Sequence, residues 1–108
     1  MVTAELAVAL PALAAVAVAV AWMLSLGTSQ MTLAQAAREG ARAAARGDAA
    51  SQVRDVVVGL VPGASVDVSR QGRRVVVTAE LDRVPPLRFL DPLGQTLRAS
   101  ATSWSEDW

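Results

Sequence analysis

Besides hydroxyls, the only side-chain groups that this sequence offers for chemistry are carboxylates. They occur in two close pairs, Glu80 with Asp82 and Glu106 with Asp107. Two carboxylates at such a spacing can act as a general acid and a general base. Alternating or terminal acids, however, usually form only the solvated face of an element. We therefore expect neither pair to be catalytic.

The sequence lacks most of the side chains on which enzymes and metal sites rely. It contains no Cys, His, Lys or Tyr. Their absence excludes thiolate and imidazole metal ligands, Ser-His and Cys-His nucleophile pairs, and a Schiff-base lysine. We therefore predict that the protein is not an enzyme and that it uses no metal, cofactor or small-molecule substrate.

The charge balance argues against a nucleic-acid partner. Ten basic residues, all of them arginine, stand against ten acidic residues, so the formal net charge is zero. Binding to a phosphate backbone requires a clustered excess of basic side chains. We therefore expect neither DNA nor RNA as a partner.

The first quarter of the chain has the composition of a membrane span. No charged residue occurs between Leu6 and Leu26, and most residues of the run are Leu, Val or Ala. About 20 such residues, at about 1.5 Å rise each, match a hydrocarbon core of about 30 Å. We assign residues 1–26 to a transmembrane anchor. A cleaved signal peptide is a weaker reading, because the run exceeds a usual apolar h-region and lacks a basic n-region.

Helix-forming residues continue beyond the apolar run. Arg38, Arg42 and Arg46 recur at i, i+4 spacing and mark one solvated stripe of a helix. The pattern predicts one long helix over residues 2–46. Its second part, residues 27–46, is expected to form a helical stalk.

A short second helix is expected after the stalk. Gly47 suits the position that follows a helix C-terminus, and Asp48 is a common N-cap residue. Pro62 and Gly63 then end the helical pattern. We expect this helix over about residues 48–60.

The rest of the chain alternates apolar and polar residues in the manner of strands. Two alternating runs, residues 65–69 and 75–82, flank a Gly-containing turn and predict a β-hairpin. A third run covers residues 96–102. The predicted fold class is therefore α+β: a long N-terminal helix, a short second helix and a three-stranded antiparallel sheet. Residues 47–108 are expected to form a small α+β domain.

Two motifs in the N-terminal half resemble those of a known family. Glu5 is followed six residues later by Pro11 in an apolar run, and residues 38–44 read Arg-Glu-Gly-Ala-Arg-Ala-Ala. On these motifs the chain resembles the TadE family of minor pilins or pseudopilins of tight-adherence (Flp-type) pili. The resemblance covers about the first 46 residues, and the predicted sheet carries no family motif.

The resemblance implies a function in filament assembly. A subunit of this family assembles through its N-terminal helix into a tight-adherence type IV-like pilus, or initiates one. The implied partners are other pilin subunits, the pilus assembly machinery, membrane lipid and a prepilin peptidase. An alternative is a single-pass envelope anchor whose small sheet domain binds something unrelated to pili.

The resemblance also implies roles near the N-terminus. Family precursors carry a short basic leader that is cleaved just before the apolar segment, so Met1 is either the processed residue or the initiator. If Met1 is processed, Glu5 stands at the family's fifth position and pairs with the α-amino group of a neighbouring subunit. A simpler reading of Glu5 is an acid that the helix macrodipole favours. Pro11 either bends the helix for packing or is tolerated there.

Two features of the long helix have open readings. Ala36, Gly40 and Ala44 form a ladder of small residues that lets helices approach closely, or they reflect an alanine-rich composition. Trp22 belongs either to an interfacial aromatic belt or to a filament core.

An apolar loop follows the second predicted strand. Leu87, Phe89 and Leu90 lie between prolines, and they either fold onto the chain's own sheet or contact a partner. The first reading is the more common one for such loops.

The orientation in the membrane rests on two conflicting signals. Arg38, Arg42 and Arg46 follow the span and favour a cytoplasmic C-terminal domain under the positive-inside rule. They begin about 12 residues beyond the span, which weakens their effect. A cleaved basic leader would favour the opposite orientation. From the resemblance we expect the bacterial cytoplasmic (inner) membrane, with the C-terminal domain outside, and a pilus at the cell surface.

Overall fold

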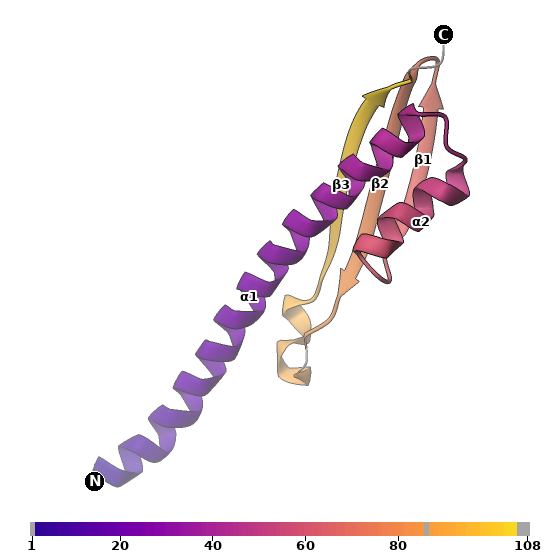
Figure 1. The fold of residues 1–108 in the computed structure, drawn as a ribbon. Helices are drawn as coiled ribbons and strands as arrows, with labels where there is room; N and C mark the ends of the chain where they lie inside the picture. The colour runs from indigo at the N-terminus through magenta and orange to yellow at the C-terminus, as the bar shows by residue number, and fades with distance from the viewer. Residues whose placement is uncertain (1, 86, 106–108) are drawn as a thin grey trace.

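The structure, a computed structural model, describes residues 2–85 and 87–105. The fold is α+β, with the order of elements that the sequence predicts. The elements are α1 (Val2–Ala45), α2 (Ala50–Leu60), β1 (Ser65–Gln71), β2 (Arg74–Arg83), η1 (Arg88–Leu93, a 3-10 helix) and β3 (Gln95–Trp104). One end of α1 lies against the sheet and the other end projects away from it (Figure 1).

Helix α1 is unbroken and determines the elongated shape of the molecule. Its 44 residues span about 66 Å at 1.5 Å rise per residue, and the longest extent of the chain is 77 Å. No residue from Val2 to Ala21 is buried, whereas a buried face begins at Trp22 and continues to the end of the helix. We call residues 2–21 the free half of α1 and residues 22–45 its packed half.

The packed half of α1 is part of the folded domain and does not extend from it as a separate stalk. Ala36, Ala37, Ala43 and Ala44 are completely buried, and Leu33 is buried beside them. Their small side chains let the helix lie close to the sheet over several turns. The division of α1 by packing therefore falls at Trp22, a few residues before the division that charge suggests.

The three strands form an antiparallel sheet in the order β1-β2-β3. The hairpin between β1 and β2 pairs Gln71 with Arg74 across a two-residue turn. Gly72 in this turn has a φ of 62°, a conformation that favours glycine. The predicted hairpin is confirmed, and its turn chemistry explains the register.

One face of the sheet is buried and the other is polar. Val75, Val77 and Ala79 of β2 point into the core, together with Leu97 and Ala99 of β3. The alternate positions on all three strands are exposed or half-buried. Helix α1 packs on β2 and β3 and α2 packs on β1, so both helices cover the same face. The domain therefore has two layers.

Helix α1 lies tightly against α2 and β2 at Gly40. A Cβ atom at this position would lie 2.8 Å from Cγ2 of Val57, 3.2 Å from Cγ1 of Val77 and 3.4 Å from Cγ1 of Val53. Val53 and Val57 belong to α2 and are completely buried, and so is Val77 of β2. Only glycine leaves room for both neighbours at this point of α1.

Helix α1 ends at Ala45, one residue before the predicted end, and Gly47 closes it as predicted. This residue has a φ of 90°, its N–H donates to the carbonyl of Ala44 at 3.1 Å, and the Asp48 N–H donates to the carbonyl of Ala43 at 3.2 Å. The guanidinium of Arg70 on β1 adds hydrogen bonds to the carbonyls of Ala44 (3.3 Å) and Asp48 (3.1 Å). A cation therefore stabilises the negative end of the helix dipole.

The predicted N-cap of α2 is wrong by one residue. The cap is Ala49, whose N–H donates to Oε1 of Gln52 at 3.0 Å, and no side chain caps from this position. The N–H of Asp48 donates to the carbonyl of Ala43 at the end of α1, and the Asp48 carboxylate lies 3.5 Å from the guanidinium of Arg46. Asp48 thus belongs to the end of the first helix, and α2 begins at Ala50.

Substitution of Gly40 by Ala is expected to destabilise the domain. The added methyl group meets the stiff, buried side chain of Val57, and overpacking of this kind costs about 1–3 kcal/mol. The gain in helix propensity is at most about 1 kcal/mol. We expect the free energy of unfolding to fall, as measured by urea denaturation of the full chain in detergent micelles.

Gly27 provides a matched control on the same helix. A Cβ atom there meets nothing within 4 Å. Gly27→Ala should therefore raise the free energy of unfolding, by up to about 1 kcal/mol. A Gly40→Ala variant as stable as Gly27→Ala would show that the contact with α2 is not tight.

Candidate functional site

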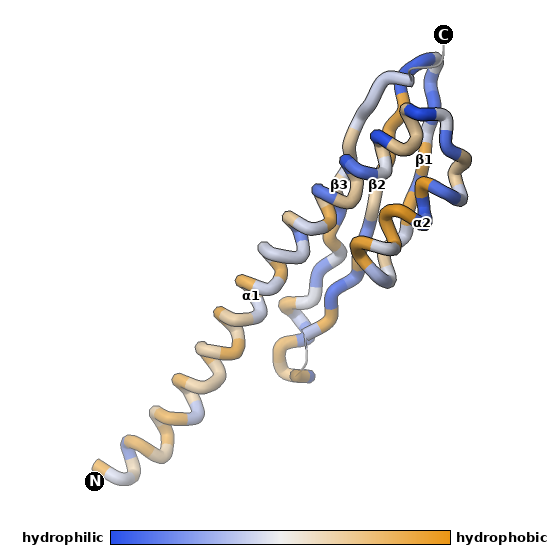
Figure 2. Tube along the Cα trace, viewed as in Figure 1, coloured by the Kyte–Doolittle hydropathy of each residue, from blue (hydrophilic) through white to orange (hydrophobic). Residues whose placement is uncertain are grey.

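The free half of α1 presents apolar side chains to all sides. Its large exposed residues are Val2, Leu6, Val8, Leu10, Leu13, Val16 and Val20. Within the described part of the chain, α1 is the one helix long and apolar enough to cross a membrane. Figure 2 shows this apolar stretch leading away from the domain. A helix that is hydrophobic all round and not buried in its own protein requires an apolar environment.

One carboxylate interrupts the apolar surface near the N-terminus. Glu5 lies in the first turns of α1, is exposed, and forms no ion pair with any other described residue. Pro11 lies inside the helix, and α1 continues through it without a break. Met1, to which the processing prediction applies, lies outside the described residues.

Polar contacts join the start of the packed half of α1 to β2 and η1. The indole Nε1 of Trp22 donates to the carbonyl of Leu93, at the end of η1, at 3.0 Å. Arg83, at the end of β2, donates from Nη2 to Oγ of Ser25 at 2.7 Å, and its guanidinium carbon lies 5.2 Å from the centre of the Trp22 ring. We call Trp22, Ser25, Arg83 and Leu93 the junction.

The junction encloses a cation beside the start of the apolar surface. Trp22 is only 7% exposed, and Nε of Arg83 is buried with no hydrogen-bond partner among the described residues. A guanidinium over an indole face is attracted to the ring, by about 0.5–2 kcal/mol depending on its desolvation. Trp22 therefore contacts the chain's own domain. Its place in an interfacial aromatic belt or in a filament core stays a prediction.

The small-residue ladder is used within the chain. Ala36 and Ala44 are completely buried, and Gly40 is buried against α2 and β2. The close approach that such a ladder permits occurs between α1 and its own domain. These three residues are therefore not exposed to a second copy of the chain.

The apolar loop is partly folded and partly exposed. Leu90 is buried at 6% exposure, whereas Leu87 is 39% exposed and Phe89 is 62% exposed. The loop thus uses Leu90 to attach to the domain and presents Phe89 to its surroundings. Whether a partner contacts it stays a prediction.

The acid pair on β2 is engaged in contacts across the sheet. Glu80 accepts a hydrogen bond from the guanidinium of Arg98, and Asp82 accepts one from Oγ1 of Thr96 at 2.7 Å. The other pair, Glu106 and Asp107, lies outside the described residues. No cluster of acids within the described ranges could hold a metal ion.

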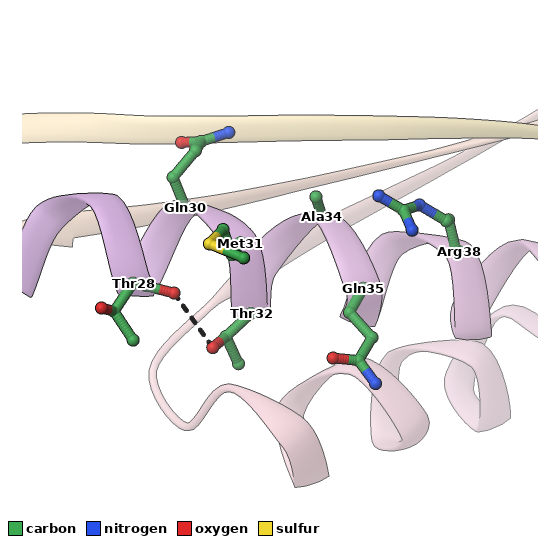
Figure 3. A pocket seen from close by; sticks show the side chains of 7 residues that line it. All are labelled: Thr28, Gln30, Met31, Thr32, Ala34, Gln35 and Arg38. Carbon is green, nitrogen blue, oxygen red and sulfur yellow. Dashed lines mark hydrogen bonds between the residues drawn. The ribbon is translucent and has the colours of Figure 1, made fainter.

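A shallow depression of about 490 Å³ runs over the outward surface of α1, between β3 and α2. Figure 3 shows Gln30 directed toward β3 and Gln35 directed toward α2. The amide of Gln30 donates to the carbonyl of Arg98 at 2.9 Å, and Oγ1 of Thr32 donates to the carbonyl of Thr28 at 3.1 Å. Gln30 thus attaches α1 to β3 and the threonines bond within the helix, and the lining residues form no convergent set of chemical groups.

Comparisons with protein-family models, with curated proteins and with solved structures gave no match.

Sequence reasoning missed the junction. Arg83 lies at the end of an alternating strand, and Ser25 lies inside an apolar helix. Nothing in the sequence around either residue indicates that the two are in contact. A single Ser and a single Trp close together near the end of an apolar run, at residues 22–25, are the only hint. Their common partner is 58 residues away from Ser25 along the chain.

Arg83→Ala is expected to destabilise the domain and loosen its attachment to α1. The variant loses the contact with Trp22 and the hydrogen bond to Ser25, which together contribute about 1–3 kcal/mol. Thermal unfolding of the full chain in micelles, followed by circular dichroism, measures the loss. Arg88→Ala is the control, since Arg88 is exposed and such substitutions usually change stability by less than about 0.5 kcal/mol. Equal stability of the two variants would contradict a structural role for the junction.

Proposed function

We propose that this protein is a membrane-anchored minor pilin or pseudopilin that assembles into, or initiates, a tight-adherence type IV-like pilus. One observation carries the proposal: an apolar half-helix without a buried residue, and with a single carboxylate near its start, is continuous with a small folded domain. The chain then acts as a structural subunit and not as an enzyme, without a cofactor. The motifs at Glu5, at Pro11 and at residues 38–44 add the family resemblance.

The dimensions of the free half support membrane insertion. Its residues number about 20, which at about 1.5 Å each match a hydrocarbon core of about 30 Å. An apolar helix continuous with a water-soluble domain suits a subunit that is stored in the cytoplasmic membrane and then transferred into a filament. In both states the exposed apolar surface is covered, first by lipid and then by neighbouring helices.

Glu5 supplies the chemical reason for assembly. An ionised carboxylate near the end of a membrane helix is costly, and its cost falls when a cation pairs with it. In the proposed filament that cation is the α-amino group of a neighbouring subunit. This pairing sets the axial register between subunits and favours their transfer out of the lipid.

A second candidate is a single-pass envelope anchor whose domain binds something unrelated to pili. The observation in its favour is the internal use of Ala36, Gly40 and Ala44, which removes one feature expected of a helix that packs on other subunits. A plain anchor does not depend on the carboxylate of Glu5. That residue therefore separates the two candidates.

Glu5→Leu is expected to abolish incorporation into filaments while leaving the protein stable and bound to membranes. The substitution removes the carboxylate and adds only apolar surface to a helix that is already apolar. Filament content is measured by immunoblotting of sheared pili, and membrane content by fractionation of the same cells. Asp55→Ala, which removes an exposed carboxylate from α2, should assemble normally. Normal piliation in Glu5→Leu would reject the pilin function and leave the plain anchor.

Processing at Met1 provides an independent test. Intact mass and N-terminal sequencing of the protein from membranes of its own cells are expected to show a chain that starts at Met1 after cleavage of a leader that ends in Gly, with or without one added methyl group. An unprocessed start would contradict the action of a prepilin peptidase.

The orientation of the domain is tested separately, by adding protease to sealed spheroplasts. Protection of the domain from the protease would contradict the external orientation.

A further inference from the structure

The connection between β2 and β3 lies beside the point where α1 leaves the domain. It contains η1, and we call residues 84, 85 and 87–94 the η1 loop. Figure 1 shows η1 at the end of the sheet that is nearest to the free half of α1. The hydrogen bond from Trp22 to the carbonyl of Leu93 fixes the loop to the first buried residue of α1. The loop therefore lies at the same level as the start of the packed half.

This level coincides with a membrane surface if the free half spans a bilayer. Val2 and Ala21 bound a stretch of about 20 residues, which fills a hydrocarbon core of about 30 Å. Trp22 then lies at the boundary between hydrocarbon and headgroups. The η1 loop, which is attached to Trp22, must reach the same boundary.

The side chains exposed on the η1 loop suit that boundary. Val84 is 74% exposed and Phe89 is 62% exposed, and Leu87 adds a third partly exposed apolar group. Arg88 is exposed among them. Aromatic rings are enriched in the interfacial region of bilayers, and an arginine there can keep its stem in apolar surroundings with its charge in the headgroup layer.

Charge makes a small contribution to this surface. The exposed Asp91 on the same loop opposes the charge of Arg88, and the guanidinium of Arg83 is engaged at the junction. Apolar contact must therefore supply most of the attraction. A contact of this kind should not require anionic lipid.

We propose that the η1 loop is a membrane-contact surface, which inserts Phe89 and Val84 into the headgroup region of the same bilayer that α1 spans. The occupant is lipid of that bilayer. The inference rests on the anchoring part of the proposed function, but not on filament assembly. With this contact the domain has two attachments to the membrane, the helix and the loop. The second attachment restricts the tilt of the sheet relative to the bilayer.

The absence of cysteine makes a direct experiment possible. Single cysteines are introduced into the full chain at Phe89 and, separately, at Val84, and each is labelled with a polarity-sensitive fluorophore. The labelled proteins are reconstituted into phosphatidylcholine vesicles, with and without phosphatidylglycerol, that contain lipids with a quencher attached near the headgroup or in the acyl chain. Labels at Leu13, in the free half, and at Trp104, at the other end of β3, are the controls.

We expect the labels at positions 89 and 84 to be quenched strongly by the headgroup-proximal quencher, and nearly equally with and without phosphatidylglycerol. The label at Leu13 should respond to the acyl-chain quencher, and the label at Trp104 to neither. Quenching at Leu13 without quenching at 89 and 84 would overturn the loop contact and leave the anchor intact. No quenching at Leu13 would overturn the anchor itself, and the loop contact with it.

A second copy of the chain is the competing occupant of the same surface. Nitroxide labels at position 89 would then show dipolar coupling between chains in the vesicles, while the fluorophore at 89 escaped the lipid quenchers. That result would overturn the lipid assignment. Lipid quenching without dipolar coupling between chains would support the lipid assignment.

Discussion

The close contact of α1 with α2 and β2 at Gly40 is the interaction on which the folded part depends. A side chain of even one carbon at this position would meet Val57 at 2.8 Å. The absence of that carbon lets a helix lie against another helix and a sheet at once. All the neighbouring buried residues of α1 are alanines or leucine, so the two layers share one thin core. A domain of this size has little apolar surface to spare, and such a core is sensitive to each added or removed methyl group.

Continuity of α1 makes this core the base of the apolar anchor. The backbone hydrogen bonds of α1 continue without interruption from Val2 to Ala45. The packing of residues several turns away therefore sets the direction in which the free half leaves the domain. The junction lies where the environment of the helix changes. Trp22 and Arg83 combine there an apolar ring, a cation and two hydrogen bonds to distant parts of the chain. Such amphipathic groups are suited to a boundary between lipid and water.

The resemblance and the structure bear on different parts of the functional argument. The assembly and processing roles that the resemblance implies concern Met1, Glu5 and Pro11, which belong to the free half or precede it, whereas its third motif, residues 38–44, lies in the packed half. The structure concerns the packed half, where it shows that residues 38–44 serve the chain's own core on one side. Arg38 and Arg42 of the same segment remain exposed on the other side. The segment therefore satisfies a local packing requirement whatever its role in a filament.

The sequence by itself determined the order and type of the elements, because these depend on local patterns. A change of period from 3.6 to 2 marks the passage from helices to strands, and Gly47 and Gly72 mark a helix end and a hairpin turn. The apolar character of the free half and the isolation of Glu5 within it were equally readable from composition and spacing.

Only the tertiary structure decided which surfaces meet. In the fold, the small-residue ladder faces the chain's own core, and Arg83 contacts Trp22 and Ser25. Asp48 bonds to the end of α1 and does not cap the start of α2. The tertiary structure also divided the apolar loop, with Leu90 in the domain and Phe89 outside it. Except at Asp48, these contacts join residues far apart in the chain, and their free energy depends on a shape that no local pattern encodes. A residue without a side chain, such as Gly40, has no preferred neighbour until the fold places three valines against it.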